Sequence, residues 1–279
     1  MQELVIGIKG AGEMASAVAH CLHRANFPLI FMMETAAPLA IRRLVSFSSA
    51  VHSGDISVES VTGVRAGNSI DVRRAWSENE IPIIVDPHWV MIKQLKPNVV
   101  IDAILAKKNL GTTTEEAEMV VALGPGFVAG KDAHVVIETN RGHNLGQLIF
   151  SGSAAKNTGI PGEIGGYSTE RVLRAPIAGH FIAEKKIGDI VESGECIGTV
   201  QDHSVKAEIG GVIRGLINDG SLVSKGLKIG DIDPRGQTDY CFSISDKARA
   251  IGGAVLTSVM MKFNCSTFRN NQKCELVYF

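Results

Sequence analysis

The residues whose types and spacing most clearly indicate a binding site lie near the N-terminus, where a glycine-rich turn follows a short apolar run. Residues 4–9, LVIGIK, have the composition of a buried parallel strand. The turn Gly10-Ala11-Gly12-Glu13-Met14-Ala15 follows directly. Apolar residues at helical spacing predict a helix over residues 15–25, and a second apolar run, residues 29–33, ends at Glu34.

This order of strand, GxGxxA turn, helix, strand and acid is typical of dinucleotide-binding folds. Gly10 would permit the tight turn, and Gly12 would let a phosphate approach the helix N-terminus. Ala15 would keep the helix close to the strand, and Glu34 would accept hydrogen bonds from a ribose. The pattern predicts a Rossmann-like α/β domain with a parallel sheet, in which NAD(P) or FAD could bind. The alternative is a scaffold that keeps the turn without the cofactor.

Two further apolar runs are expected to extend the same sheet. Residues 81–85 end at Asp86, and residues 99–101 end at Asp102. Ligands of parallel sheets bind beyond the carboxyl ends of the strands, so Asp102 and the following residues 103–109 are expected near the glycine turn. The alternative for Asp102 is a cap of a turn.

A polar loop over residues 138–146 is a second candidate site. Arg141 could grip a phosphate or carboxylate in a fork, His143 could donate or shuttle a proton, and Asn144 adds a further donor. The alternative is a solvated hairpin tip. The pair Arg42-Arg43 offers another anion site, with a solvated helix face as its alternative.

An internal repeat is the most specific pattern in the chain. Residues 175–200 align without a gap with residues 207–232, and eight small or apolar positions recur in register. This predicts two interlocking halves of one β-sandwich or barrel. The pattern resembles biotinyl/lipoyl domains, but the connection over residues 201–205 contains neither Lys nor Met. A barrel-sandwich hybrid without biotin or lipoate is therefore expected.

Composition narrows the class of protein. The formal net charge is −1, with 28 Lys and Arg against 29 Asp and Glu, which gives no reason to expect nucleic acid or a membrane surface as a partner. The five cysteines are far apart without a CxxC pattern, and no signal peptide is recognised, so a cytoplasmic protein is expected. His20 and His23 lack a third ligand at suitable spacing, so no metal site is predicted.

Three regions follow from these patterns. Residues 1–168 are predicted as the Rossmann-like α/β domain and residues 169–236 as the barrel-sandwich hybrid. Residues 237–279 are predicted to form a C-terminal helix, capped by Ser245-Asp246 and ending near Lys262, that packs on the α/β domain. The tail after residue 264, which contains Cys265 and Cys274, shows no clear period.

Seven segments together resemble the YqeB family of accessory proteins of selenium-dependent molybdenum hydroxylases, which is similar in part to the XdhC/CoxI maturation factors. The resemblance spans residues 5–258, and the segments are IKGAGEMASAVAHCLHRANF, AIRRLVSFSSAV, VVIDAILAKKNLGT, ALGPGFVAGKDAHVVIETNRGHNLG, NTGIPG, GLKIGDIDPRG and ISDKARAIGG.

The resemblance implies a maturation factor that helps to insert a cofactor into a molybdenum hydroxylase client. Molybdopterin, or its dinucleotide, would then be the small nucleotide-like ligand, and a homo-oligomer is compatible with this role. No catalytic residue is carried over. The alternative is an NAD(P)-dependent oxidoreductase, which the sequence disfavours because it has only three tyrosines and no Y-x-x-x-K pattern.

Overall fold

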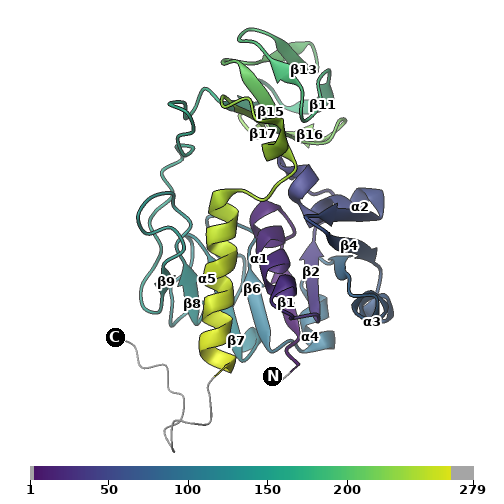
Figure 1. The fold of residues 1–279 in the computed structure, drawn as a ribbon, viewed down its shortest axis with the longest axis vertical. Coiled ribbons are helices and arrows are strands. Elements are labelled where there is room, and N and C mark those ends of the chain that lie inside the picture. Colours follow the sequence, from purple (N-terminus) through teal and green to yellow (C-terminus); the bar gives the residue numbers. More distant parts are fainter. Residues whose placement is uncertain (1–2, 265–279) are drawn as a thin grey trace, which may run out of the picture.

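The computed structural model describes residues 3–264. Figure 1 shows a large part, built on one wide sheet with helices on both faces, and a smaller all-β part at one end of it. We call the smaller part, residues 172–233, the β-module. An extended segment leads into the β-module from the large sheet, and a short 3₁₀ turn leads out of it into the last helix.

The large sheet has nine strands in the order β3-β4-β5-β2-β1-β6-β7-β8-β9. The seven strands from β4 to β8 in this order run parallel, whereas β3 and β9 pair antiparallel at the two edges. The bounds are β1 (Ile6–Lys9), β2 (Ile30–Glu34), β3 (Asp55–Val58), β4 (Val61–Ala66), β5 (Ile81–Val85), β6 (Val99–Asp102), β7 (Met119–Leu123), β8 (Val135–Ile137) and β9 (Leu148–Ile149).

Two hydrophobic cores cover the faces of this sheet. One contains α1 (Glu13–Arg24), α2 (Ala50–Ser53) and α5 (Asp246–Phe263), and the other contains α3 (Ser69–Ser77) and α4 (Val90–Leu95). The central strands β1, β6 and β7 are buried along their whole length because both faces are covered. The 3₁₀ turns are η1 (Arg43–Val45), η2 (Phe47–Ser49), η3 (Thr114–Glu116) and η4 (Thr238–Cys241).

The β-module consists of two four-stranded antiparallel sheets, β10-β17-β15-β12 and β14-β13-β11-β16. Each copy of the internal repeat, taken with the strand just before it (β10 or β14), supplies two strands to each sheet, so the copies interlock around one core. The strands are β10 (Val172–Arg174), β11 (Gly179–Ala183), β12 (Ile190–Val191), β13 (Cys196–Val200), β14 (His203–Lys206), β15 (Gly211–Leu216), β16 (Leu222–Val223) and β17 (Lys228–Asp233).

The fold class predicted from the sequence is corrected by this architecture. A parallel Rossmann-like sheet joined to a biotinyl/lipoyl-like barrel-sandwich hybrid was expected. The large sheet is instead mixed, and the β-module is two separate antiparallel sheets. The glycine-turn pattern predicts only the local strand–helix–strand unit from β1 to β2, not the rest of the sheet. Both edge strands pair antiparallel with a strand adjacent in the sequence, β3 with β4 and β9 with β8.

The last helix, α5, lies along α1 (Figure 1). Ser245 caps its N-terminus by accepting a hydrogen bond from the backbone N–H of Ala248. Gly252 faces α1 so closely that a Cβ there would lie 2.9 Å from the carbonyl oxygen of Ala17. Across residues 3–264 no helix is long and apolar enough to cross a membrane. Cys265 and Cys274 lie outside the described residues.

Two neighbouring glycines of α5 provide a matched test of this packing. We expect Gly252→Ala to lower the free energy of unfolding by about 1–3 kcal/mol, because the added methyl group would overlap α1. A Cβ at Gly253 would meet no atom within 4 Å. Gly253→Ala should therefore raise stability by about 0.5–1 kcal/mol through helix propensity. Urea unfolding of both variants measures the difference, and equal effects would contradict the close packing.

Candidate functional site

Two cavities adjoin where the large sheet meets the β-module. The first, about 550 Å³, lies between the start of α1, the polar loop after β8, the β-module and the start of α5; we call it the interdomain cleft. The second, about 510 Å³, lies beside the glycine turn after β1; we call it the loop cavity. Glu13, Met14 and Lys247 line both, so the two spaces are neighbours.

The interdomain cleft has a surplus of positive charge. Its acidic lining residues are Glu13 and Glu163. Glu13 is already neutralised, since its Oε1 accepts hydrogen bonds from Arg42 Nη1 at 3.0 Å and Ser245 Oγ at 2.8 Å. The seven cationic lining residues are Lys107, Arg141, Lys156, Arg171, Arg214, Lys228 and Lys247. This balance is suited to an anionic ligand.

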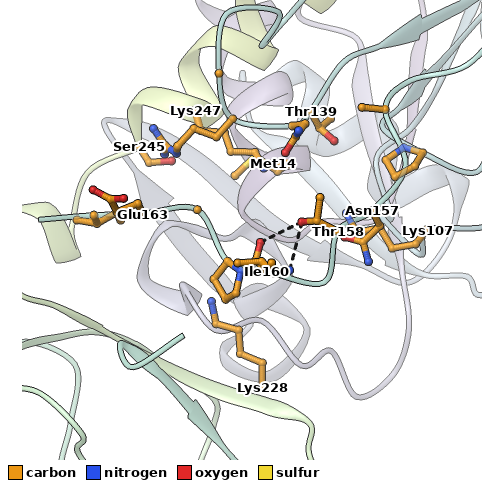
Figure 2. Close-up of a pocket in the computed structure, with 18 of the residues that line it drawn as sticks. Met14, Lys107, Thr139, Asn157, Thr158, Ile160, Glu163, Lys228, Ser245 and Lys247 are labelled. Atoms are coloured by element: carbon orange, nitrogen blue, oxygen red, sulfur yellow. Dashed lines mark hydrogen bonds between the residues drawn. The ribbon is translucent and has the colours of Figure 1, made fainter. Parts of the chain in front are cut away.

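The lysines labelled in Figure 2 lie on different sides of the cleft: they are Lys107, Lys228 and Lys247. Burial lowers the pKa of Lys247, and the positive charges of Lys107 and Arg141 lower it further. The pKa of Lys107 is also lowered by desolvation, although its side chain reaches the exposed rim. Within the described part of the chain, neither ammonium group has a hydrogen bond or an ion pair. Both ammonium groups therefore lack a bonded partner, although the more distant carboxylates of Glu13 and Glu138 oppose the lowered pKa of Lys247.

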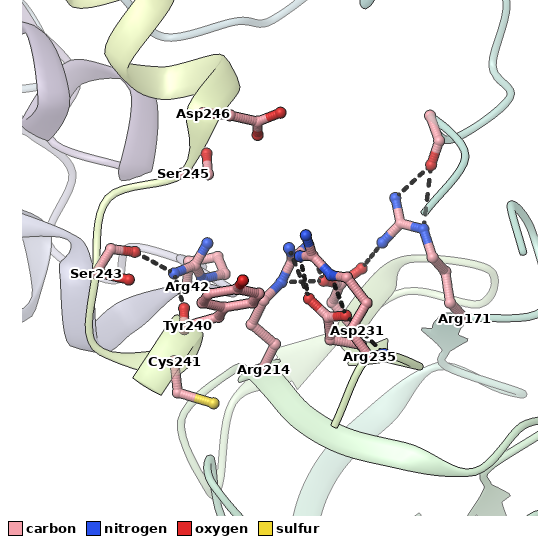
Figure 3. Close-up of polar contacts among 12 residues, drawn as sticks. Arg42, Arg171, Arg214, Asp231, Arg235, Tyr240, Cys241, Ser243, Ser245 and Asp246 are labelled. Carbon is pink, nitrogen blue, oxygen red and sulfur yellow. Dashed lines mark hydrogen bonds and ion pairs between the residues drawn. The ribbon is translucent and has the colours of Figure 1, made fainter. Parts of the chain in front are cut away.

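The β-module presents a network of arginines to the same cleft (Figure 3). Asp231 binds Arg171 and Arg214, and its Oδ1 lies 3.6 Å from the ammonium group of Lys228. Burial lowers the pKa of Lys228, and the charge of Asp231 opposes that shift. Asp233 in turn binds Arg214 at 3.2 Å and Arg235 at 2.6 Å. Four cations thus share two carboxylates.

Arg141 lies on the opposite wall, where it binds the first residue of α5. Its Nη1 and Nη2 donate to the carboxylate of Asp246 at 2.5 and 3.0 Å. This bidentate pair lowers the pKa of Asp246 to about 2. Residues 155–164 also border the cleft, and Arg171 donates to the carbonyl oxygen of Gly162 at 2.8 and 3.1 Å. Arg171, a cation of the cleft, therefore holds the segment that connects the large sheet to the β-module.

The glycine turn forms one end of the loop cavity. Gly10 has φ +88°, and a Cβ there would lie 3.2 Å from Cα of Ile104, so glycine is required. A Cβ at Gly12 would meet no atom within 4 Å, which means that this residue borders open space. Glu34 holds the turn, because its Oε2 accepts from the backbone N–H of Ala11 at 2.8 Å. Its Oε1 accepts from the N–H of Thr35 at 2.7 Å.

The residues predicted from the sequence are distributed unevenly around these spaces. Gly10, Gly12 and Glu34 line the loop cavity, and Arg141 lines the interdomain cleft. Ala15 is fully buried against the sheet. The expected gathering of the other residues is wrong, because His143 and Asn144 line neither space, and nor does Asp102.

Asp102 is kept from the cavities by a buried network. Its side chain accepts hydrogen bonds from Thr112 Oγ1 at 2.7 Å and from the N–H of Ile104 at 3.2 Å. Thr112 Oγ1 in turn accepts from the ammonium group of Lys9 at 2.7 Å. Lys9 is wholly buried and also binds Glu116 Oε1 at 2.7 Å. Asp102 therefore helps to balance a buried charge instead of facing a ligand.

Sequence reasoning missed the lysines that matter most here and misread Arg42. Lys228 lies in the repeat and Lys247 in the first turn of a helix, where a lysine is ordinarily solvated. Arg42 serves neither as an anion site nor on a solvated face, because it is 6% exposed and binds Glu13. Among residues 3–264, no three His, Cys, Asp or Glu side chains gather as a potential metal site.

The comparison with solved structures found weak likenesses. One is an aspartoacylase family protein of Mesorhizobium loti, with TM-score 0.27, 10% identity and coverage of 83% of this chain and 85% of that one. Another is the ectoine utilization protein EutE of Ruegeria pomeroyi, with TM-score 0.23, 9% identity and coverage of 83% and 58%. A succinylglutamate desuccinylase/aspartoacylase of Rhodobacter sphaeroides has TM-score 0.20, 12% identity and coverage of 81% and 51%.

These TM-scores are too low to support an argument about chemistry. None of the three proteins is described as a Rossmann nucleotide-binding protein or as a molybdenum-enzyme maturation factor.

Sequence comparison is more informative. No family model matches the chain. Over 259 residues, however, the chain is 51% identical to the YqeB protein of Escherichia coli (strain K12). The match covers 93% of this chain and 48% of that protein, so the chain spans about half the length of its relative. The chain therefore belongs to the YqeB family.

Proposed function

We propose that the chain binds a polyanion, bearing phosphate or carboxylate groups, in the interdomain cleft. The observation that carries this proposal is the unpartnered pair of cations, Lys107 and Lys247. Holding an ammonium group in a partly buried place without a carboxylate costs free energy. A bound anion would offset that cost and would receive charge-assisted hydrogen bonds from both lysines.

The other cations of the cleft support a ligand with more than one negative charge. Lys228 and Arg214 come from the β-module, and Arg171 directly precedes it. Lys107, Arg141 and Lys247 come from the larger part, or from the helix that packs on it. A ligand with a single charge would neutralise only one wall. A polyanion would neutralise both walls and hold the two parts together.

The arrangement of these groups is suited to binding and delivery. Arg171, Arg214 and Arg141 are each held by an aspartate, so their side chains are ordered before a ligand arrives. Preorganised side chains reduce the entropy that binding would otherwise lose. A chaperone of a charged cofactor needs such a cleft more than it needs a tuned acid–base pair.

The accessory role in maturing a selenium-dependent molybdenum hydroxylase belongs to the same proposal. It rests on the segment resemblance described above, and a phosphorylated cofactor of the molybdopterin class would supply the charge that the cleft requires. The role is proposed for the protein as a whole. The aligned relative is about twice as long as this chain. The client enzyme would be the partner that receives the cofactor.

Binding of inorganic tripolyphosphate tests the charge of the cleft. We expect Lys107→Ala and Lys247→Ala each to weaken the affinity by about tenfold or more, because each variant removes one charge-assisted hydrogen bond. Lys131→Ala is the matched control, since Lys131 is exposed and lines neither space. Isothermal titration calorimetry measures all three. Equal affinities of the cleft variants and the control would contradict the proposal.

The lowered lysine pKa values predict proton uptake on binding. A bound anion raises the pKa of Lys247, which lies below the ordinary 10.5 in the free protein. Well below the lowered pKa the amine is protonated in both states, so few protons are exchanged. As the pH rises toward the lowered pKa, the free amine loses its proton and the bound form regains it. Calorimetry in buffers of different ionisation enthalpy should therefore show uptake that grows with pH.

The matched variant for this experiment is Lys247→Arg, which retains the positive charge but cannot titrate in this range. It should keep most of the affinity and lose a large share of the proton uptake. If the proton uptake of Lys247→Arg is unchanged, the group that titrates on binding is not Lys247.

Deletion of the protein in its native host tests the accessory role. A selenium-dependent molybdenum hydroxylase should then be expressed and folded, yet inactive, because its cofactor or selenium has not been inserted. Elemental analysis of the purified client should show a deficit of molybdenum or selenium. Normal molybdenum and selenium contents with full activity would contradict the accessory role. The anion-binding proposal would still be decided by the calorimetry.

A further inference from the structure

The loop cavity differs from the interdomain cleft in the chemistry of its walls. Its lining is largely apolar and includes Leu39, Trp89, Leu105 and Leu110 together with the shared Met14. Leu39 and Leu110 are 45% and 46% exposed. Large apolar side chains that remain half-exposed beside a cavity are typical of a surface that a ligand covers. The cleft next to it is lined by seven cations.

The two spaces can be occupied by one molecule. Glu13, Met14 and Lys247 line both, so the apolar cavity and the charged cleft adjoin along these side chains. Gly12 borders the loop cavity and a side chain at this position would project into open space. Lys247 therefore stands at the boundary where an apolar group of a ligand would give way to its charged end.

Trp89 gives the loop cavity a fixed aromatic wall. The ammonium group of Lys9 lies 5.3 Å from the centroid of its ring, a cation–π contact that holds the indole. Lys9 is itself wholly buried and bound to Glu116, so it cannot move away readily. A rigid indole in an apolar cavity favours a ring over a flexible chain as its occupant.

From this arrangement we infer that the two cavities form one bipartite site for a ring-bearing polyanion. Its apolar ring lies in the loop cavity beside Trp89, and its anionic groups lie among the lysines and arginines of the cleft. The inference rests on the proposed function, because it assigns the second half of the same ligand. It adds the requirement that the ligand carries an apolar ring, which the charge of the cleft alone does not impose.

Two probes separate the two halves of the site. The first is inorganic tripolyphosphate, which carries charge without a ring, and the second is 2-naphthyl triphosphate, which carries both. The wild-type protein should bind the naphthyl ester about tenfold more tightly, because the ring buries apolar surface in the loop cavity. Titration calorimetry of the full chain measures both affinities.

Neutral substitutions at the mouth of the loop cavity test where the ring lies. Leu39→Gln and Leu110→Gln, separately and together, should remove most of the tenfold advantage of the naphthyl ester. They should leave the affinity for tripolyphosphate within about twofold, since they change no charge. Ile70→Gln is the matched control, because Ile70 is 76% exposed on α3 and lines neither space. All of these residues are exposed, so the variants should fold.

The inference is overturned if the wild-type protein binds both probes equally, or if the double variant retains the advantage of the naphthyl ester. Failure of the proposed function has a different signature. Tripolyphosphate would then bind the Lys107→Ala and Lys247→Ala variants as well as it binds the wild type, whatever the leucine variants do. If neither probe binds the wild type at all, both are overturned.

Discussion

The contact between Arg42 and Glu13 holds the candidate site together. Arg42 is buried, and its guanidinium binds Glu13 at the start of α1 at 3.0 Å. It also donates to the carbonyl oxygens of Tyr240 and Ser243, each at 2.7 Å, in the segment that leads from the β-module to α5. One side chain thus connects three parts of the chain. Removing one member of such a buried pair typically costs about 3–5 kcal/mol, because the other charge is left uncompensated.

The same contact determines the charge of the cleft. Arg42 neutralises Glu13, which would otherwise be available to Lys247, and the lysines of the cleft keep their surplus charge. Desolvation lowers the pKa values of Lys107 and Lys247, and the charges of Lys107 and Arg141 lower that of Lys247 further, so the free protein stores unfavourable electrostatic free energy there. An anion that binds only the folded protein would relieve it and would stabilise the contact between the β-module and the larger part.

Sequence reasoning succeeded where the signal is local. The turn from β1 into α1 could be predicted because Gly10 and the helical spacing after it lie within one short segment, and Gly10, Gly12 and Glu34 do line a cavity. The hairpin of β3 with β4 was not predicted, because its turn residues, Glu59 and Ser60, are not the types that usually mark such a turn. Asp102 does lie beside the glycine turn, opposite Lys9, but its buried role could not be predicted. Its partner Thr112 and the buried Lys9 have no sequence pattern that marks them as a network.

The most direct test of the polyanion site is a crystal structure of the protein soaked in tungstate, with an anomalous difference map. Tungstate carries the charge and tetrahedral shape of phosphate and scatters strongly. The account predicts the strongest peak in the interdomain cleft, within hydrogen-bond distance of Lys247 and of at least one other cation among Lys107, Arg141 and Lys228. Peaks only on the outer surface, with an empty cleft at a concentration that saturates binding in solution, would contradict it.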